Sequence, residues 1–190
     1  MITWLTAFID TPEFEASAQF WCHVSQSTLS QRRGDAAEFA TLIPATGDAY
    51  LRIQQVSRPP RIHLDLHVEQ PHEVAQIATR LGASVVADRG YVVLRSPGGL
   101  EFCVVEGAAG TVPASTAHGI ALDQVCLDID GASYLAEIEF WCSLTGWQSQ
   151  ELGLPGFHRL GVPAQLPLKM LFQQRERAAG ETGAHLDIAC

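Results

Sequence analysis

The sequence predicts an α+β protein, and three observations support this prediction. Residues 61–68, Arg-Ile-His-Leu-Asp-Leu-His-Val, alternate polar and apolar side chains, which is typical of a half-buried strand. Apolar residues at helical spacing between residues 14 and 22 indicate an amphipathic helix. The Phe-Trp-Cys of residues 20–22 returns at residues 140–142, an offset of about 120 residues that indicates a duplicated strand–helix–strands unit.

The first half of the chain is expected to run strand, helix and strands twice over. Thr11 is suited to cap the first helix, with Pro12 at the first helical position. The second helix is expected to begin near Pro71 and to stop at Gly82. The expected strands are 3–9, 39–43, 49–56, 61–68, 84–87, 91–95 and 101–105.

The second half repeats the first only in part. Residues 107–118 have the Gly, Ala, Thr, Pro and Ser composition of a linker, so we expect one complete domain at 1–106 and a partial one at 119–190. Cys190 corresponds to Val68. The last expected strand would therefore have a free edge, where chains readily pair. We expect that the sequence is a fragment; the alternative is that another chain, as in a homodimer, covers this edge.

Composition excludes several classes of function. The formal net charge is −9 and the 12 Lys and Arg residues are scattered, so nucleic acid is not an expected partner, because phosphate binding needs clustered cations. No apolar run approaches the roughly 20 residues of a membrane span, and the N-terminus lacks the pattern of a signal peptide. The five cysteines form an odd count without a Cys-x-x-Cys pair, which favours a reducing, cytoplasmic location.

The polar face of the 61–68 strand is the first candidate site. His63 and Asp65 share that face, and alternation along the first strand places Trp4 and Phe8 on the matching side. Aromatic and polar groups together suit a small organic ligand. Packing of the rings within the core, and a structural role for the polar pair, are the alternatives. The predicted ligand-binding residues are Trp4, Phe8, His63, Asp65 and Cys103, the thiol expected to reach the same cavity.

Five stretches, taken in order, carry a resemblance to a known family, the glyoxalase-like branch of the vicinal oxygen chelate superfamily. They are Asp10-Thr-Pro followed by Phe20-Trp21, Leu51-x-Ile-Gln-Gln-Val, Arg61-Ile-His-Leu-Asp-Leu, Leu81-Gly82-Ala83 and Ser96-Pro-Gly-Gly-Leu-Glu-Phe-Cys103. That superfamily includes glyoxalase I, bleomycin-resistance proteins and extradiol dioxygenases. The resemblance implies paired βαβββ modules, with curled mixed sheets around a cavity and helices outside.

The same resemblance implies where a metal would bind. In the first domain the family's ligand positions fall on Trp4, His63 and Cys103, among others, and only His63 is a usual ligand. We therefore expect no catalytic metal in the first domain, since a catalytic site needs about three protein ligands. In the second domain Gln124 and His185 match ligand positions, so a divalent metal (Zn, Mn, Fe or Ni) is the expectation there if the ligand set is completed.

Three hypotheses of function follow. The first is a metal-free, glyoxalase-like protein that binds a small organic molecule in an aromatic and His-lined cavity. The second is a metal-dependent lyase or dioxygenase of the same superfamily. The third is an interaction protein that pairs through the open sheet edge of the second domain.

Overall fold

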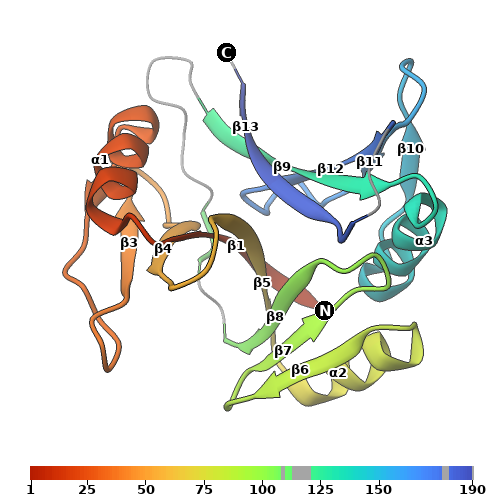
Figure 1. The fold of residues 1–190 in the computed structure, drawn as a ribbon, viewed down its shortest axis with the longest axis horizontal. Helices are drawn as coiled ribbons and strands as arrows, with labels where there is room; N and C mark the ends of the chain where they lie inside the picture. Colours follow the sequence, from red (N-terminus) through yellow and green to blue (C-terminus); the bar gives the residue numbers. More distant parts are fainter. Residues whose placement is uncertain (108–109, 113–120, 177–179, 190) are drawn as a thin grey trace.

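The structure is a computed structural model that describes residues 1–107, 110–112, 121–176 and 180–189 (Figure 1). Its helices are α1 (Phe14–Ser25), α2 (Pro71–Arg80) and α3 (Tyr134–Thr145). The first sheet contains β1 (Ile2–Thr11), β2 (Thr28–Leu29), β3 (Phe39–Ile43), β4 (Leu51–Gln55), β5 (Arg61–Val68), β6 (Ser84–Asp88), β7 (Val92–Arg95) and β8 (Glu101–Glu106). The second contains β9 (Ala121–Asp130), β10 (Ser149–Glu151), β11 (Phe157–Leu160), β12 (Lys169–Arg175) and β13 (Gly183–Ala189). The prediction of an α+β fold is confirmed.

The centre of the first sheet is formed by β1 and β5, which lie antiparallel in the order β2-β3-β4-β1-β5-β8-β7-β6. β4 runs parallel to β1 on one side, and β8 runs parallel to β5 on the other. This register sets Asp10 opposite Arg61, and Asp65 opposite Cys103. Because successive side chains alternate between the faces of a strand, the polar side chains of β1, β5 and β8 converge on one face.

The second sheet repeats half of this pattern, in the order β10-β11-β12-β9-β13. β12 is parallel to β9, and β13 is antiparallel to it. Among the described residues β13 pairs with β9 alone, and Ile188 on it is 47% exposed. Pairing of a partner at the outer edge of β13 therefore stays a prediction, as does the division into domains 1–106 and 119–190.

The first helix begins later than the sequence predicts. Thr11 is still part of β1, where it pairs with Gln55 of β4, so it cannot cap the helix. Its hydroxyl instead accepts a hydrogen bond from the backbone N–H of Glu13, at 3.1 Å. The expectation of Thr11 as cap and Pro12 as first helical residue was wrong because the sheet extends through this segment, and α1 begins at Phe14.

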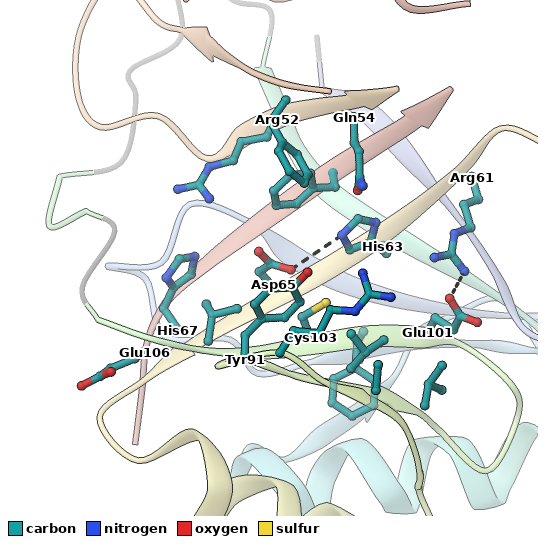
Figure 2. Close-up of a pocket in the computed structure, with 18 of the residues that line it drawn as sticks. Arg52, Gln54, Arg61, His63, Asp65, His67, Tyr91, Glu101, Cys103 and Glu106 are labelled. Carbon is teal, nitrogen blue, oxygen red and sulfur yellow. Dashed lines mark ion pairs between the residues drawn. The ribbon is translucent and has the colours of Figure 1, made fainter. Parts of the chain in front are cut away.

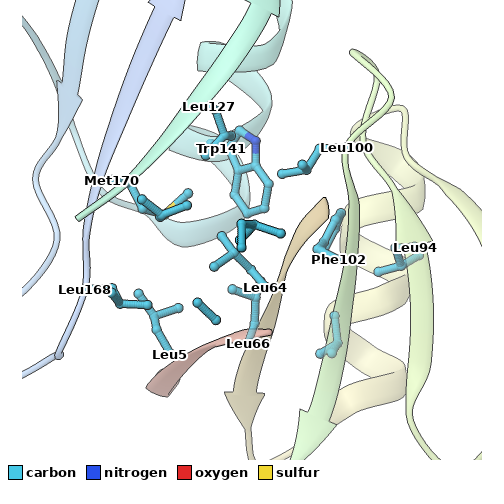
Figure 3. Packing of buried hydrophobic residues seen from close by; sticks show 14 of the residues in the cluster. Leu5, Leu64, Leu66, Leu94, Leu100, Phe102, Leu127, Trp141, Leu168 and Met170 are labelled. Carbon is cyan, nitrogen blue, oxygen red and sulfur yellow. The ribbon is translucent and has the colours of Figure 1, made fainter. Parts of the chain in front are cut away.

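The two sheets share one apolar core (Figure 3). Leu64 and Leu66 of β5 are fully buried on the face turned away from His63 and Asp65. They lie near Met170 of β12 in this core (Figure 3). The sheets therefore pack back to back, and their polar faces point away from one another.

A buried carboxylate joins the two halves of this core. Glu137 of α3 is fully buried, and its Oε2 accepts the backbone N–H of Gly98 at 2.7 Å, while Oε1 accepts the indole N–H of Trp141 at 2.9 Å. The backbone N–H of Thr182 donates to the carbonyl of Gly98, also at 2.7 Å. A Cβ at residue 98 would lie 2.5 Å from the Thr182 hydroxyl, so this turn requires glycine. Burial raises the pKa of Glu137, against the hydrogen bonds from Ser96, Trp141 and Gly98.

Most of the predicted linker, 107–118, lies outside the described residues, as does Cys190. The described cysteines, 22, 103, 126 and 142, are all free thiols. No helix in the described part of the chain is long and apolar enough to cross a membrane.

Candidate ligand cavity and its charged network

The polar face of the first sheet lines a cavity of about 630 Å³ (Figure 2). Phe8, His63, Asp65 and Cys103 all line it, so the structure brings four of the five predicted ligand-binding residues into one site. Figure 2 shows Arg52 and Gln54 on one side of the cavity and Tyr91 and Cys103 on the other, with His63 and Asp65 between them. Whether these residues bind a ligand stays a prediction.

The fifth residue, Trp4, does not lie among the cavity-lining residues. It is on the same face of β1 as Phe8, as alternation requires, but it is fully buried. The backbone at Gly110 covers its ring so closely that a Cβ there would lie 2.7 Å from the indole. Asp48 holds this segment, because its carboxylate accepts the backbone N–H groups of Thr111 and Val112 at 2.7 and 3.0 Å. The expectation that Trp4 faces the ligand cavity was thus wrong, since a segment distant in sequence covers it.

Asp10 orients the imidazole of His63. The Nδ1 atom of His63 lies 3.0 Å from Oδ1 of Asp10, and its Nε2 lies 3.7 Å from Oδ1 of Asp65. Phe8 stacks on the same ring, with the centroids 4.7 Å apart and the planes 9° from parallel. The imidazole is therefore fixed by a carboxylate on one edge and by an aromatic face, and its other nitrogen is directed toward Asp65.

A cluster of ion pairs surrounds this contact. Asp10 is fully buried, and its Oδ2 lies 2.9 Å from Nε of Arg61. Burial alone would raise the pKa of Asp10, but His63 and Arg61 outweigh it and lower the pKa. Glu101 pairs with Arg61, Arg58 and Arg95. These cations likewise overcome the effect of burial and lower the pKa of Glu101 to about 2. Both carboxyl groups are therefore ionised near neutral pH.

Asp10 and Arg61 were missing from the residues predicted for the site. The signal that could have revealed them is the register of β1 against β5, which places Asp10 beside Arg61 and Phe8 beside His63. A period of two fixes the face of each side chain but not which residues of two strands lie opposite.

His63, Asp65 and Cys103 form a group with metal-ligand chemistry. One ligand atom from each lies within 4.8 Å of the others, and all three residues are buried. Oδ1 of Asp65 is buried and has no hydrogen-bond partner among the described residues. Burial raises the pKa of Asp65, and burial together with the Asp65 charge raises the pKa of the Cys103 thiol. Without a metal this thiol is protonated and therefore a poor nucleophile.

The second sheet carries a more exposed group on its polar face. The predicted metal-binding residues Gln124 and His185 are linked by Asp187, whose Oδ2 accepts the Gln124 amide at 2.6 Å and whose Oδ1 lies 3.2 Å from Nε2 of His185. Nδ1 of His185 lies 2.8 Å from Asp128. Cys126, Asp128 and His185 form another group with ligand atoms within 4.8 Å of one another, although the His185 side chain is 46% exposed.

Comparison with known proteins assigns the chain to a family. The model of the glyoxalase-like domain matches residues 6–105 and 124–190. Among solved structures, the Mn(II)-bound glyoxalase from Novosphingobium aromaticivorans is similar with a TM-score of 0.68 and 15% identity, over 92% of this chain and 62% of that one. This chain thus spans less than two thirds of that relative.

Two dioxygenases give a similar result. BphC, a halotolerant catechol dioxygenase, has a TM-score of 0.68 at 14% identity, over 99% of this chain and 70% of its own. The 2,2',3-trihydroxybiphenyl 1,2-dioxygenase of Sphingomonas wittichii has a TM-score of 0.67 at 12% identity, over 98% of this chain and 72% of its own. No curated protein matches the chain. At these identities the structural likeness shows the fold alone, and the family follows from the match of the domain model. The chain belongs to the glyoxalase-like domain family.

Proposed function

We propose that this protein binds a small organic molecule in the cavity of the first sheet. The observation that carries the proposal is the cavity itself: about 630 Å³, with the stacked Phe8 and His63 in its wall. Ligand sites of small molecules fall in the range of roughly 300–1,000 Å³ and combine apolar walls with a few placed polar groups.

The polar wall is held by contacts within the protein. Asp10 and Phe8 contact His63, and Arg61 contacts Asp10, so contacts within the protein restrict these side chains. Ordering a mobile side chain on binding costs roughly 0.5–1.5 kcal/mol. A preorganised wall avoids that cost, which favours recognition of a ligand over a purely structural role for the network.

Filling the cavity is expected to abolish binding. Val93 lines the cavity from β7, whereas Val85 on β6 is 55% exposed and is not among its lining residues. We expect Val93→Trp to weaken binding of the neutral fluorescent probe N-phenyl-1-naphthylamine at least tenfold, because the indole takes up the space. Val85→Trp should leave the affinity unchanged. Fluorescence titration of the two variants and the wild type measures this.

The outcomes of this titration are decisive. Saturable binding that is lost only in Val93→Trp supports the proposal. An unchanged affinity in Val93→Trp, or no saturable binding to the wild type, contradicts it.

A second candidate is metal-dependent chemistry of the lyase or dioxygenase kind, and the buried His63–Asp65–Cys103 group favours it. The residues present fit a metal: they offer nitrogen, oxygen and sulfur donors, and one oxygen of Asp65 is buried without a partner among the described residues. Nδ1 of His63 lies 3.0 Å from Asp10 and Nε2 lies 3.7 Å from Asp65, so Nε2 is the atom that would bind the metal. A divalent metal held there would polarise neighbouring oxygens of a bound molecule as a Lewis acid.

Metal content distinguishes the two groups of ligands. This candidate requires that the protein, incubated with Zn²⁺, Mn²⁺, Fe²⁺ or Ni²⁺ and desalted, retain near-stoichiometric metal that is lost in His63→Ala and kept in His185→Ala. Elemental analysis is the measurement. Loss in His185→Ala alone would move the site to the second sheet, with Gln124 as the further ligand. Retention of no metal under any of these conditions would end this candidate.

A further inference from the structure

The cavity has a charge opposite to that of the whole chain. The formal net charge of the protein is −9, with 12 Lys and Arg residues in total. Five of those residues line this one cavity, against three carboxylates. The five are Arg33, Arg52, Arg58, Arg61 and Arg89. The cavity therefore concentrates positive charge in a protein that is otherwise acidic.

The arginines of the cavity fall into different environments. Arg58 and Arg61 are neutralised by ion pairs with Asp10 and Glu101. Arg52 is half-buried, and no carboxylate among the described residues lies within ion-pair distance of it. Its Nε is buried and has no acceptor in the described part of the chain. A desolvated guanidinium without a partner is costly, because charge and hydrogen-bond donors are both left uncompensated.

The groups around Arg52 compensate its charge only in part. Burial lowers the pKa of Arg52, the Asp65 charge opposes this, and the charge of Arg33 lowers it further. Burial and the Arg52 charge lower the pKa of His67 to about 4, so His67 is neutral near pH 7. Phe8 offers its ring face 5.6 Å from the guanidinium carbon. Two mutually repelling cations and an aromatic face thus border the part of the cavity beside Arg52, where no carboxylate of the described residues forms an ion pair with this guanidinium.

We propose that the ligand of this cavity is an aromatic carboxylate, with its carboxylate on the Arg52 guanidinium and its ring beside Phe8 and Tyr91. The proposal rests on the proposed function and specifies its ligand class. A guanidinium binds a carboxylate through two parallel N–H···O bonds, a geometry that a neutral amide cannot reproduce. Arg52 extends from β4 into the cavity opposite Tyr91, which leaves the ring of such a ligand between the two walls (Figure 2).

Matched probes that differ only in charge test the proposal. Isothermal titration calorimetry compares benzoate with benzamide, and 2-naphthoate with 2-naphthamide, on the wild type, Arg52→Gln and Arg159→Gln. Arg159 on β11 is exposed and is not among the lining residues of the cavity, so it controls for loss of one positive charge. Thermal unfolding of each variant confirms that it is folded.

We expect at least one carboxylate to bind the wild type ten times more tightly than its amide. Arg52→Gln should remove that preference and leave the affinity for the amide within twofold, while Arg159→Gln changes neither. Equal affinities for acid and amide in the wild type would overturn the anion inference and leave the proposed cavity function standing. Binding of none of the four probes at millimolar concentration would overturn this ligand class.

Discussion

Asp10→Ala is expected to lower the free energy of unfolding by about 3–5 kcal/mol, because it removes the fully buried carboxylate from a network of ion pairs. Asp10 is fully buried, and its two oxygens lie 3.0 Å from Nδ1 of His63 and 2.9 Å from Nε of Arg61. Without the carboxylate, Arg61 keeps Glu101 as an ion-pair partner but loses Asp10, and His63 loses the carboxylate beside its Nδ1. The substitution should therefore lower stability and also disturb the position of His63 in the cavity wall.

Asp88→Ala is the matched control for this variant. Asp88 also pairs with a histidine, His72, at 3.1 Å, but both side chains are more than half exposed. An exposed ion pair contributes at most about 1 kcal/mol. Urea unfolding at pH 7 of the two variants and the wild type gives the comparison. If Asp10→Ala lowered the free energy of unfolding no more than Asp88→Ala does, the ion pairs of Asp10 would not stabilise the fold. The role of Asp10 in orienting His63 would then have to be abandoned.

Glu137→Ala is expected to lower the free energy of unfolding by roughly 2–6 kcal/mol, since each buried donor left without an acceptor costs about 1–3 kcal/mol. The backbone N–H of Gly98 and the indole N–H of Trp141 both lose their acceptor. The first belongs to the turn before β8 and the second to α3, so the same change loosens the contact between the two halves of the chain.

The control is Glu139→Ala, an exposed carboxylate on the same helix. Denaturant unfolding measures stability, and hydrogen exchange of the Gly98 amide reports on the contact itself. We expect faster exchange at Gly98 in Glu137→Ala and no change in Glu139→Ala. A Gly98 amide that stays protected in Glu137→Ala would show that the turn is held by the Thr182 contacts instead.

The sequence was sufficient to predict the position of a side chain where that position depends on neighbouring residues of the same strand. Strand alternation correctly separated His63 and Asp65 from Leu64 and Leu66, because successive residues of a strand must face opposite ways. It was insufficient where a side chain depends on contacts from distant segments. Trp4 has the predicted face but is covered at Gly110, and no periodicity in β1 encodes the path of that segment.

The charged network illustrates the same limit. His63 was visible as a candidate residue, but the Asp10 carboxylate that holds it comes from another strand, 53 positions earlier in the chain by residue number. Glu137 is a further case, because a glutamate in a helix is usually exposed. Here the acceptors it provides for Gly98 and Trp141 justify its burial, and those donors are identified only once the two sheets are packed.

The back-to-back packing of the sheets has a thermodynamic consequence. Because Leu64, Leu66 and Trp141 belong to one continuous core, neither sheet can unfold without exposing the apolar face of the other. The chain is therefore expected to melt as one cooperative unit. A molecule bound in the cavity of the first sheet would then raise the melting temperature of the whole chain, and would slow the opening of β9 and β13 on the far side, without touching either strand.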